Sequence, residues 1–441
     1  DFLSGVEESA FFNIPEASNL YNQIIQNEKA ADPTLKYAYI ALKNNFTLIE
    51  MANDVLNFIV INGLGLYQNL VKFASNSFQQ IYFDLDDTPN SIVDIDEVDS
   101  LKIISNEFND IQEDVKIISL AKSGFESTLT ISSNTCRNMK VLSFFYLKSK
   151  GIAAVNIINN HFTKSEFTNT LISISAGKSY DHWVFDSNRI TSAKFYLATE
   201  NIQGERFGLL QFINTASTDI HNLILTNNTF KDIDFDKKEM YTSPIQLCLL
   251  VLQTKQTVNL TNNLMKDLKN FGYGNLIYML NLPSFIIKDC KFVLISYTSF
   301  TGMISLSSEK TYITNSTFDR ISNDENFGVF YLKTFLTEHT IQIKNSTFVD
   351  LNIENQAGVL AVRSTDYSSE AKFDPLKKTI TKLDLEISDS NIINLFGAHT
   401  LPLAEVDCSN CALTYNFSNI SNNFLQDVIE VTEGCRGNLQ I

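Results

Sequence analysis

The chain carries little positive charge. Its 441 residues include 34 Lys and Arg against 50 Asp and Glu, which gives a formal net charge of −16. An acidic balance of this kind argues against nucleic acid and anionic membrane surfaces as partners. We therefore expect no nucleic acid partner.

Long apolar runs are also missing. No run reaches 18 residues, and the best one, residues 56–61, is interrupted by Asn62 and Gly63. A spanning helix needs about 20 apolar residues, so no direct membrane insertion is expected for these residues. The sequence begins at Asp1 without Met and ends at Ile441 without a recognisable cap, which favours a cleaved signal peptide and a C-terminal continuation. The expected location is extracellular or at the cell surface, reached through the secretory pathway.

The chain is rich in one repeated motif. A polar step of Asn, Ser, Thr or Asp precedes a large apolar residue, here called the anchor, and a second apolar residue usually follows three positions later. The clearest copies are residues 227–233, 315–321 and 345–351. Fourteen anchors can be assigned, at Tyr21, Phe46, Phe78, Phe108, Cys136, Phe162, Ile190, Phe230, Met265, Phe292, Phe318, Phe348, Ile392 and Phe417. Their mean spacing of roughly 30 residues is typical of solenoids and repeat arrays.

The motif predicts strands rather than helices. Polar and apolar residues alternate before the anchor, as in residues 311–314, and Gly302, Gly328 and Gly358 each open a short apolar run ten residues after their anchors. Such runs, rich in Ile, Val, Phe, Tyr and Thr, are typical of strands. Amphipathic stretches of ten or more residues are missing from the copies, which argues against helical repeats. An all-β parallel β-helix fits this pattern.

Stacking of coils explains why each position is repeated. Parallel strands lie about 4.8 Å apart, so Phe would lie over Phe and Ile over Ile in a continuous core. The polar residue before the anchor tolerates a left-handed corner and can form an amide ladder. We expect a single solenoid of about 14 coils, with repeats over 17–420, an N-terminal cap or joint at 1–16 and a C-terminal cap or joint at 421–441.

The repeat resembles that of known proteins. It is similar to the right-handed parallel β-helix proteins of the pectin-lyase-like superfamily, and the Asn-Ser-Thr-Phe step followed by a Gly-apolar run resembles repeats of polymorphic outer-membrane proteins and of protist surface proteins, ciliates included. The resemblance covers about residues 17–425 and implies a right-handed helix. It implies little about function, because the superfamily includes lyases, hydrolases, adhesins and structural shafts.

Seven Asn-x-Ser/Thr sequons are candidate N-glycosylation sites, at Asn45, Asn227, Asn259, Asn315, Asn345, Asn416 and Asn419. Four of them, Asn45, Asn227, Asn315 and Asn345, are assigned to the repeated corner. If these corners face solvent, the glycans form a stripe along the stack. If the same Asn residues form an internal ladder, attachment there is blocked.

The cysteines allow two interpretations. Cys411 and Cys435 are 24 residues apart, close to one short coil, and Cys408 competes as a partner for a structural disulfide. Cys408 and Cys411 also form a Cys-x-x-Cys pair, but no His lies nearby, so a disulfide is favoured over zinc. Neither a metal nor another cofactor is expected.

Two groups of residues are candidates for catalysis. Asp232 and Asp267 share the second position after their anchors, and Arg320 and Asp350 occupy the same column further on. Paired carboxylates beside a cation are what lyases and hydrolases of this fold use. A solvated corner without a function is the favoured explanation of the column, because like charges in water repel by only ~1 kcal/mol at this spacing.

The second group combines Asp181, His182 and Asp186 with the single Trp, Trp183. Packing of the Trp at an irregular coil is the simpler interpretation. The chain lacks the paired Asp-Asp, Gly-His-Gly and Arg-Ile-Lys signatures of the hydrolases in this superfamily, and it lacks the Gly-Gly-x-Gly-x-Asp calcium repeat.

These observations favour a non-enzymatic extracellular structural glycoprotein. Its expected role is a rigid β-helical shaft of a cell-surface or filament assembly, with copies of itself, other surface glycoproteins and N-linked glycans as partners. A carbohydrate-binding adhesin is one alternative, since Tyr278 and Tyr331 could be displayed on a strand face. A polysaccharide lyase or glycoside hydrolase is the other.

Overall fold

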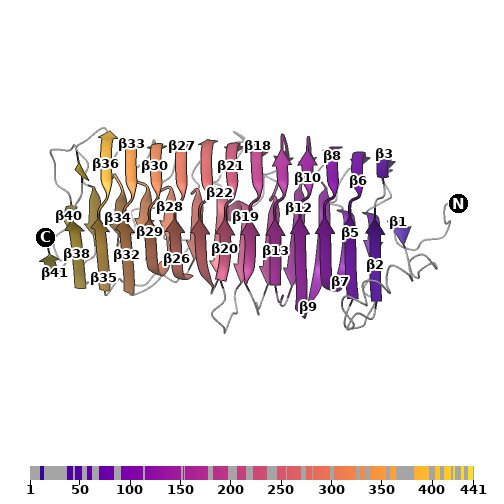
Figure 1. Cartoon of the computed structure of the whole chain (residues 1–441), viewed down its shortest axis with the longest axis horizontal. Helices are drawn as coiled ribbons and strands as arrows, with labels where there is room; N and C mark the ends of the chain where they lie inside the picture. The colour runs from indigo at the N-terminus through magenta and orange to yellow at the C-terminus, as the bar shows by residue number, and fades with distance from the viewer. Residues whose placement is uncertain are drawn as a thin grey trace. The chain divides into compact units, whose positions relative to one another are not determined.

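The computed structural model describes residues 10–13, 37–42, 45–51, 57–61, 69–83, 91–112, 115–149, 152, 154–176, 182–196, 206–214, 222–235, 246–254, 256–269, 275–280, 282–297, 302–323, 328–332, 338–353, 358–363, 382–396, 403–407, 412–418, 421–422, 429–431 and 436–440. Over these residues the chain is all-β, with parallel pairing between its strands and no helix. It divides into two compact units, the first containing residues 1–198 and 213–221 and the second residues 199–212 and 222–441. Both are built on one plan (Figure 1).

Each unit contains three parallel ladders. We call the strands that contain the anchors the anchor ladder, those just before them the upstream ladder, and those just after them the downstream ladder. A strand pairs with the strand at the same position of the next repeat, which in the second unit is three strands further along the chain. Such an order is compatible with a solenoid, and we call one repeat of the three strands a coil.

In the first unit the upstream ladder contains β2 (Tyr37–Leu42), β5 (Asn69–Ala74), the later parts of β7 (Ser91–Ile104) and β9 (Lys116–Ser132), β13 (Ala154–Ile158) and β17 (Trp183–Asp186). The anchor ladder contains β3 (Asn45–Met51), β6 (Ser77–Phe83), β8 (Glu107–Gln112), β10 (Thr135–Arg137) with β11 (Lys140–Val141), β14 (His161–Thr163) with β15 (Glu166–Phe167), and β18 (Arg189–Phe195). The downstream ladder contains β1 (Ala10–Asn13), β4 (Asn57–Ile61), the earlier parts of β7 and β9, β12 (Ser143–Ser149) and β16 (Ile172–Ala176).

In the second unit the upstream ladder contains β20 (Asn222–Thr226), β23 (Thr257–Thr261), β26 (Leu282–Lys288), β29 (Ser308–Thr314), β32 (Glu338–Lys344), β35 (Lys382–Ser388), β38 (Ala412–Ser418) and β41 (Arg436–Gln440). The anchor ladder contains β21 (Thr229–Phe235), β24 (Leu264–Lys269), β27 (Lys291–Tyr297), β30 (Thr317–Asn323), β33 (Thr347–Ile353), β36 (Asn391–Phe396) and β39 (Ser421–Asn422). The downstream ladder contains β19 (Arg206–Asn214), β22 (Gln246–Thr254), β25 (Ile277–Leu280), β28 (Ile304–Leu306), β31 (Phe330–Leu332), β34 (Leu360–Arg363), β37 (Ala404–Asp407) and β40 (Ile429–Val431).

The predicted stacking of anchors is confirmed within each unit. Twelve of the fourteen anchors, Phe46 through Ile392 in sequence order, lie on anchor-ladder strands, and those that follow one another within a unit pair in register. Phe78 and Phe108 stack with ring centroids 4.9 Å apart, and Phe318 lies 4.7 Å from Phe292 and 4.9 Å from Phe348. Parallel in-register strands impose this arrangement, because the ring separations equal the strand spacing.

The last assigned anchor is wrong. Phe417 lies on the upstream ladder, in register with Ile387, and the residue in register with Ile392 is Asn422. The upstream strand β38 also alternates apolar and polar residues, so an Asn before its Phe imitates the motif five residues too early. Tyr21, the first anchor, lies outside the described residues.

The described parts of the two expected terminal segments belong to the same ladders. β1, within 1–16, pairs with β4. In 421–441, β39, β40 and β41 pair with β36, β37 and β38.

Two positions per coil adopt left-handed backbone, with φ between 49° and 56°. The first lies three residues before the anchor, at Ser75, Ser105, Ser133, Asn159, Ser187, Asn227, Asn262, Asp289, Asn315, Asn345 and Asp389. The second lies two residues after it, at Gln80, Asp110, Asn138, Lys164, Ser192, Asp232, Asp267, Leu294, Arg320, Asp350 and Asn394. Short polar residues tolerate this conformation best, which explains the polar step in the motif.

Candidate functional surfaces

A buried polar column runs beside the anchors, two positions before each of them. In the first unit it consists of asparagines, Asn76, Asn106, Asn134, Asn160 and Asn188, each at most 2% exposed. Asn106 shows the bonding: its backbone N–H and its Nδ2 both donate to Oδ1 of Asn134, at 2.9 and 3.0 Å. The same Nδ2 donates to the carbonyl of Phe73 at 3.0 Å. Asn134 and Asn160 repeat these three bonds, so their buried amides are satisfied by the neighbouring coils.

The corresponding column of the second unit has a different chemistry. It starts with Asn228 and Asn263, whose side chains are joined at 2.9 Å, and continues with Cys290, Ser316, Ser346 and Ser390. Here each backbone N–H donates to the next Ser hydroxyl at 3.2–3.4 Å, and the hydroxyl donates to a nearby carbonyl. Burial raises the pKa of the Cys290 thiol. Cys136 and Cys248 are also buried.

The repeated sequons lie on the outside of this column. Asn227, Asn315 and Asn345 are exposed residues at left-handed corners. The residue in the middle of each sequon, not the Asn that begins it, is the buried column member. Of the two arrangements that the sequence left open, the structure has the corner Asn residues facing solvent. Asn227 accepts a hydrogen bond from Nδ2 of Asn262 at 2.7 Å.

The other candidate glycosylation sites differ from these three. Asn45 pairs with Ser77, next to the anchor, so its assignment to the repeated corner is wrong. Asn259 and Asn416 are half-buried on the upstream strands β23 and β38. Asn419, and with it the disulfide candidates Cys408, Cys411 and Cys435, lies outside the described residues.

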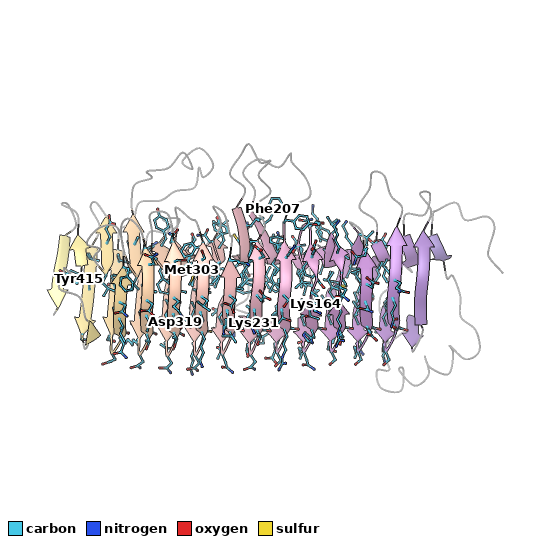
Figure 2. All side chains as sticks on the ribbon, turned by 90° about the horizontal axis from the view of Figure 1, so that it is seen from above. Lys164, Phe207, Lys231, Met303, Asp319 and Tyr415 are labelled. Atoms are coloured by element: carbon cyan, nitrogen blue, oxygen red, sulfur yellow. The ribbon has the colours of Figure 1, made fainter. Side chains whose placement is uncertain are left out.

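The column of candidate catalytic carboxylates lies on the exposed side of the anchor ladder. Asp232, Asp267, Arg320 and Asp350 occupy left-handed positions in the second unit, with Leu294 at the same position between Asp267 and Arg320. Oδ2 of Asp319 forms an ion pair with Arg320 at 2.9 Å, and this contact raises the pKa of the guanidinium. Figure 2 labels Lys231 and Asp319 among these outer side chains.

Charges of both signs therefore meet along the column. Asn394 donates to Asp350 at 2.8 Å, so a neutral amide follows Asp350 in the column. Among the described residues, no three His, Cys, Asp or Glu side chains gather in a way that could hold a metal ion.

The Trp-containing group is divided between core and surface. Trp183 is fully buried on β17, in register with Val155, which confirms that it packs in the core. His182 is exposed and Asp186 half-buried, while Asp181 lies outside the described residues. Because β17 is a regular strand of its ladder, the Trp belongs to the stack.

The tyrosines considered for ligand binding are buried. Tyr278 is 6% exposed and Tyr331 7%. Tyr331 packs with Ala361, and Tyr278 with Cys248 and Val251. They are not displayed on a strand face, contrary to what the adhesin interpretation required. Alternation along the strand could not reveal this, because the downstream ladder of the second unit is buried on both of its faces.

Within the described part of the chain, no helix is long and apolar enough to cross a membrane. No protein-family model matches the chain, and a search of curated proteins finds no match.

Proposed function

We propose that the chain is a single right-handed parallel β-helix of about 14 coils, of the pectin-lyase-like kind, and that it acts as a non-enzymatic extracellular structural glycoprotein. Its role is to form the rigid shaft of a cell-surface or filament assembly, joined to copies of itself or to other surface glycoproteins. The observation that carries the proposal is the unbroken register of the anchor and polar columns within each unit. Regularity of this kind serves a stiff repeating support, in which every coil is stabilised by its neighbours.

The surface chemistry supports the same role. Three sequon asparagines, Asn227, Asn315 and Asn345, face solvent at the corners, where attached glycans leave the stack undisturbed. Cations lie beside the outer carboxylates, since Lys231 and Lys266 directly precede Asp232 and Asp267 in the sequence and Arg320 forms an ion pair with Asp319. Such a column is well explained as a solvated face.

The experiment is electron microscopy of the untagged protein taken from its natural source. Ordered filaments or lattices with a regular repeat are the expected result. Dispersed single particles would contradict the assembly role. A polysaccharide-cleavage assay and a glycan-binding assay on the same material then test the lyase or hydrolase and the adhesin alternatives directly.

A further inference from the structure

One part of this acidic chain is basic. Residues 132–196 contain eight Lys and Arg against three Asp and Glu, whereas the whole chain has a net charge of −16. The excess of positive charge therefore belongs to one stretch of the first unit. Its placement in the fold decides whether it forms a surface.

Five of these cations project from three successive repeats of the anchor ladder. All five are exposed, and we call them the basic face: Arg137, Lys140, Lys164, Arg189 and Lys194. Lys140 and Lys194 lie on either side of Glu166 in adjacent strands, and Lys194 forms an ion pair with it at 3.7 Å. Lys164, labelled in Figure 2, occupies the left-handed position between two strands.

The pKa of a histidine within the basic face reflects the positive charge around it. His161 is in register with Arg189 and Thr135. Its pKa is lowered by burial first and then by the charges of Arg137 and Arg189. The face is therefore suited to a carboxylate-rich partner.

The same ladder in the second unit has no such excess. Lys231 and Lys266 there directly precede Asp232 and Asp267 in the sequence, and Lys269 pairs with Asp234 at 3.8 Å. The basic face is thus a local feature rather than a property of the ladder. These three lysines supply a matched control.

The chain also contains a complementary acidic stretch. Between Phe73 and Leu101 there are seven Asp and Glu and no Lys, Arg or His. Four of the seven, Asp94, Asp96, Glu97 and Asp99, lie on β7. Ile95 and Val98 are buried between them, as expected for a half-buried strand. β7 pairs with β4, β5 and β9 and is not part of the anchor ladder.

We propose that the basic face binds the β7 acidic stretch, residues 94–99, of a second copy of this chain. The inference rests on the proposed shaft and names the surface through which shafts associate laterally. The basic face and residues 94–99 are different surfaces, so the contact between copies is heterologous. Contacts of this kind build open arrays unless the rotation that relates successive copies closes a ring. At ~0.1 M salt the Debye length is about 10 Å, so repulsion between the net charges of two copies is screened while direct contacts between opposite charges remain. At ~1 M salt the Debye length falls to about 3 Å, and these contacts are weakened too.

The test is sedimentation velocity of the 441-residue chain in ~0.1 M and ~1 M NaCl. We expect reversible association at the lower salt and monomers at the higher. The variant K140E/K164E/K194E should associate at least about tenfold more weakly. The control K231E/K266E/K269E makes the same charge change on the second unit and should associate like the natural chain.

Carboxyl-to-amine crosslinking of a mixture of isotopically light and heavy chains identifies the segment that the basic face binds. Links between copies should join Lys140, Lys164 or Lys194 to residues 94–99. Three results would each overturn the proposal. They are no association at ~0.1 M salt, equal weakening of association by both variants, and links that join the basic face to another segment. If native filaments are seen while both variants behave alike, this inference fails and the structural role stands. If the chains associate in a salt-dependent way but form no native filaments, this inference stands and the structural role fails.

Discussion

At the scale of single residues, the left-handed position after the anchor is occupied by side chains of unequal suitability. Asn138 and Asn394 suit it, whereas Leu294 has φ of 55° with a branched apolar side chain. Left-handed backbone costs an ordinary residue about 1–2 kcal/mol, and Asn less. The sequence motif could not reveal this strain, because Leu after Phe and Val looks like an ordinary strand residue.

We therefore expect Leu294→Asn to stabilise the chain by about 0.5–1 kcal/mol. The matched reverse change, Asn138→Leu, should destabilise it by about 1 kcal/mol, since it puts Leu where Asn now lies. Urea unfolding midpoints of the two variants and the natural chain measure both effects. Destabilisation by Leu294→Asn would show that packing of the leucine outweighs its backbone strain.

His161 gives a prediction about pH. Its pKa in the folded chain lies below the ordinary value of 6.5, so the unfolded chain binds this proton more readily. Stability contributed by neutral His161 is therefore complete above pH 6.5 and is lost as the pH falls through the depressed folded pKa. His161→Gln should flatten the stability profile below pH 6.5.

NMR titration of the ring protons measures that pKa directly. Arg137→Gln together with Arg189→Gln should raise the pKa but leave it below 6.5, because burial is the larger cause. A pKa unchanged by both substitutions would show that the two guanidinium groups create no field at the ring.

At the scale of the structural elements, the polar column determines how coils are joined. Asn134→Ala removes the acceptor of two donors of Asn106, its backbone N–H and its Nδ2. Each buried donor left without a partner costs about 1–3 kcal/mol, so the loss should be at least about 2 kcal/mol. The control is Asn156→Ala. Asn156 is a half-buried residue of β13 outside the polar column, and its loss should cost less than about 1 kcal/mol.

The serine column of the second unit should be more tolerant. Ser346→Ala removes the acceptor of one backbone N–H, that of Ser316, and no side-chain donor loses its acceptor. The denaturation midpoint should therefore fall less than it does for Asn134→Ala. Equal losses in the two variants would contradict a difference in bonding between the polar columns of the two units.

The same elements show what the sequence could and could not predict. The sequence predicted the strands, their parallel stacking and twelve anchors, because packing imposes the repeat period. Phe318, for example, must contact its counterparts in both neighbouring coils. The internal ladder was also expected, but its position was not. Spacing alone does not separate Asn315 from Ser316, and only the backbone turn shows which of them is buried.

At the scale of the whole molecule, the corners determine where glycans can leave the stack. Asn315 and Asn345 lie at the same corner of successive coils, where the backbone N–H of Asn315 donates to the carbonyl of Lys344 at 3.2 Å. Their attachment points are thus separated by one strand spacing, about 4.8 Å. Two branched glycans leaving side by side crowd each other. Asn227 lies on the same edge three coils earlier, at the corner before β21.

We therefore expect competition between the two neighbouring sites when the chain is produced through a eukaryotic secretory pathway. Asn345→Gln should raise occupancy at Asn315, Asn315→Gln should raise it at Asn345, and neither should change Asn227. Glycopeptide mass spectrometry measures each site, and the intact mass counts glycans per chain. Full occupancy of both sites on one chain would contradict the crowding argument, because the stack gives the two glycans no room to diverge at their roots.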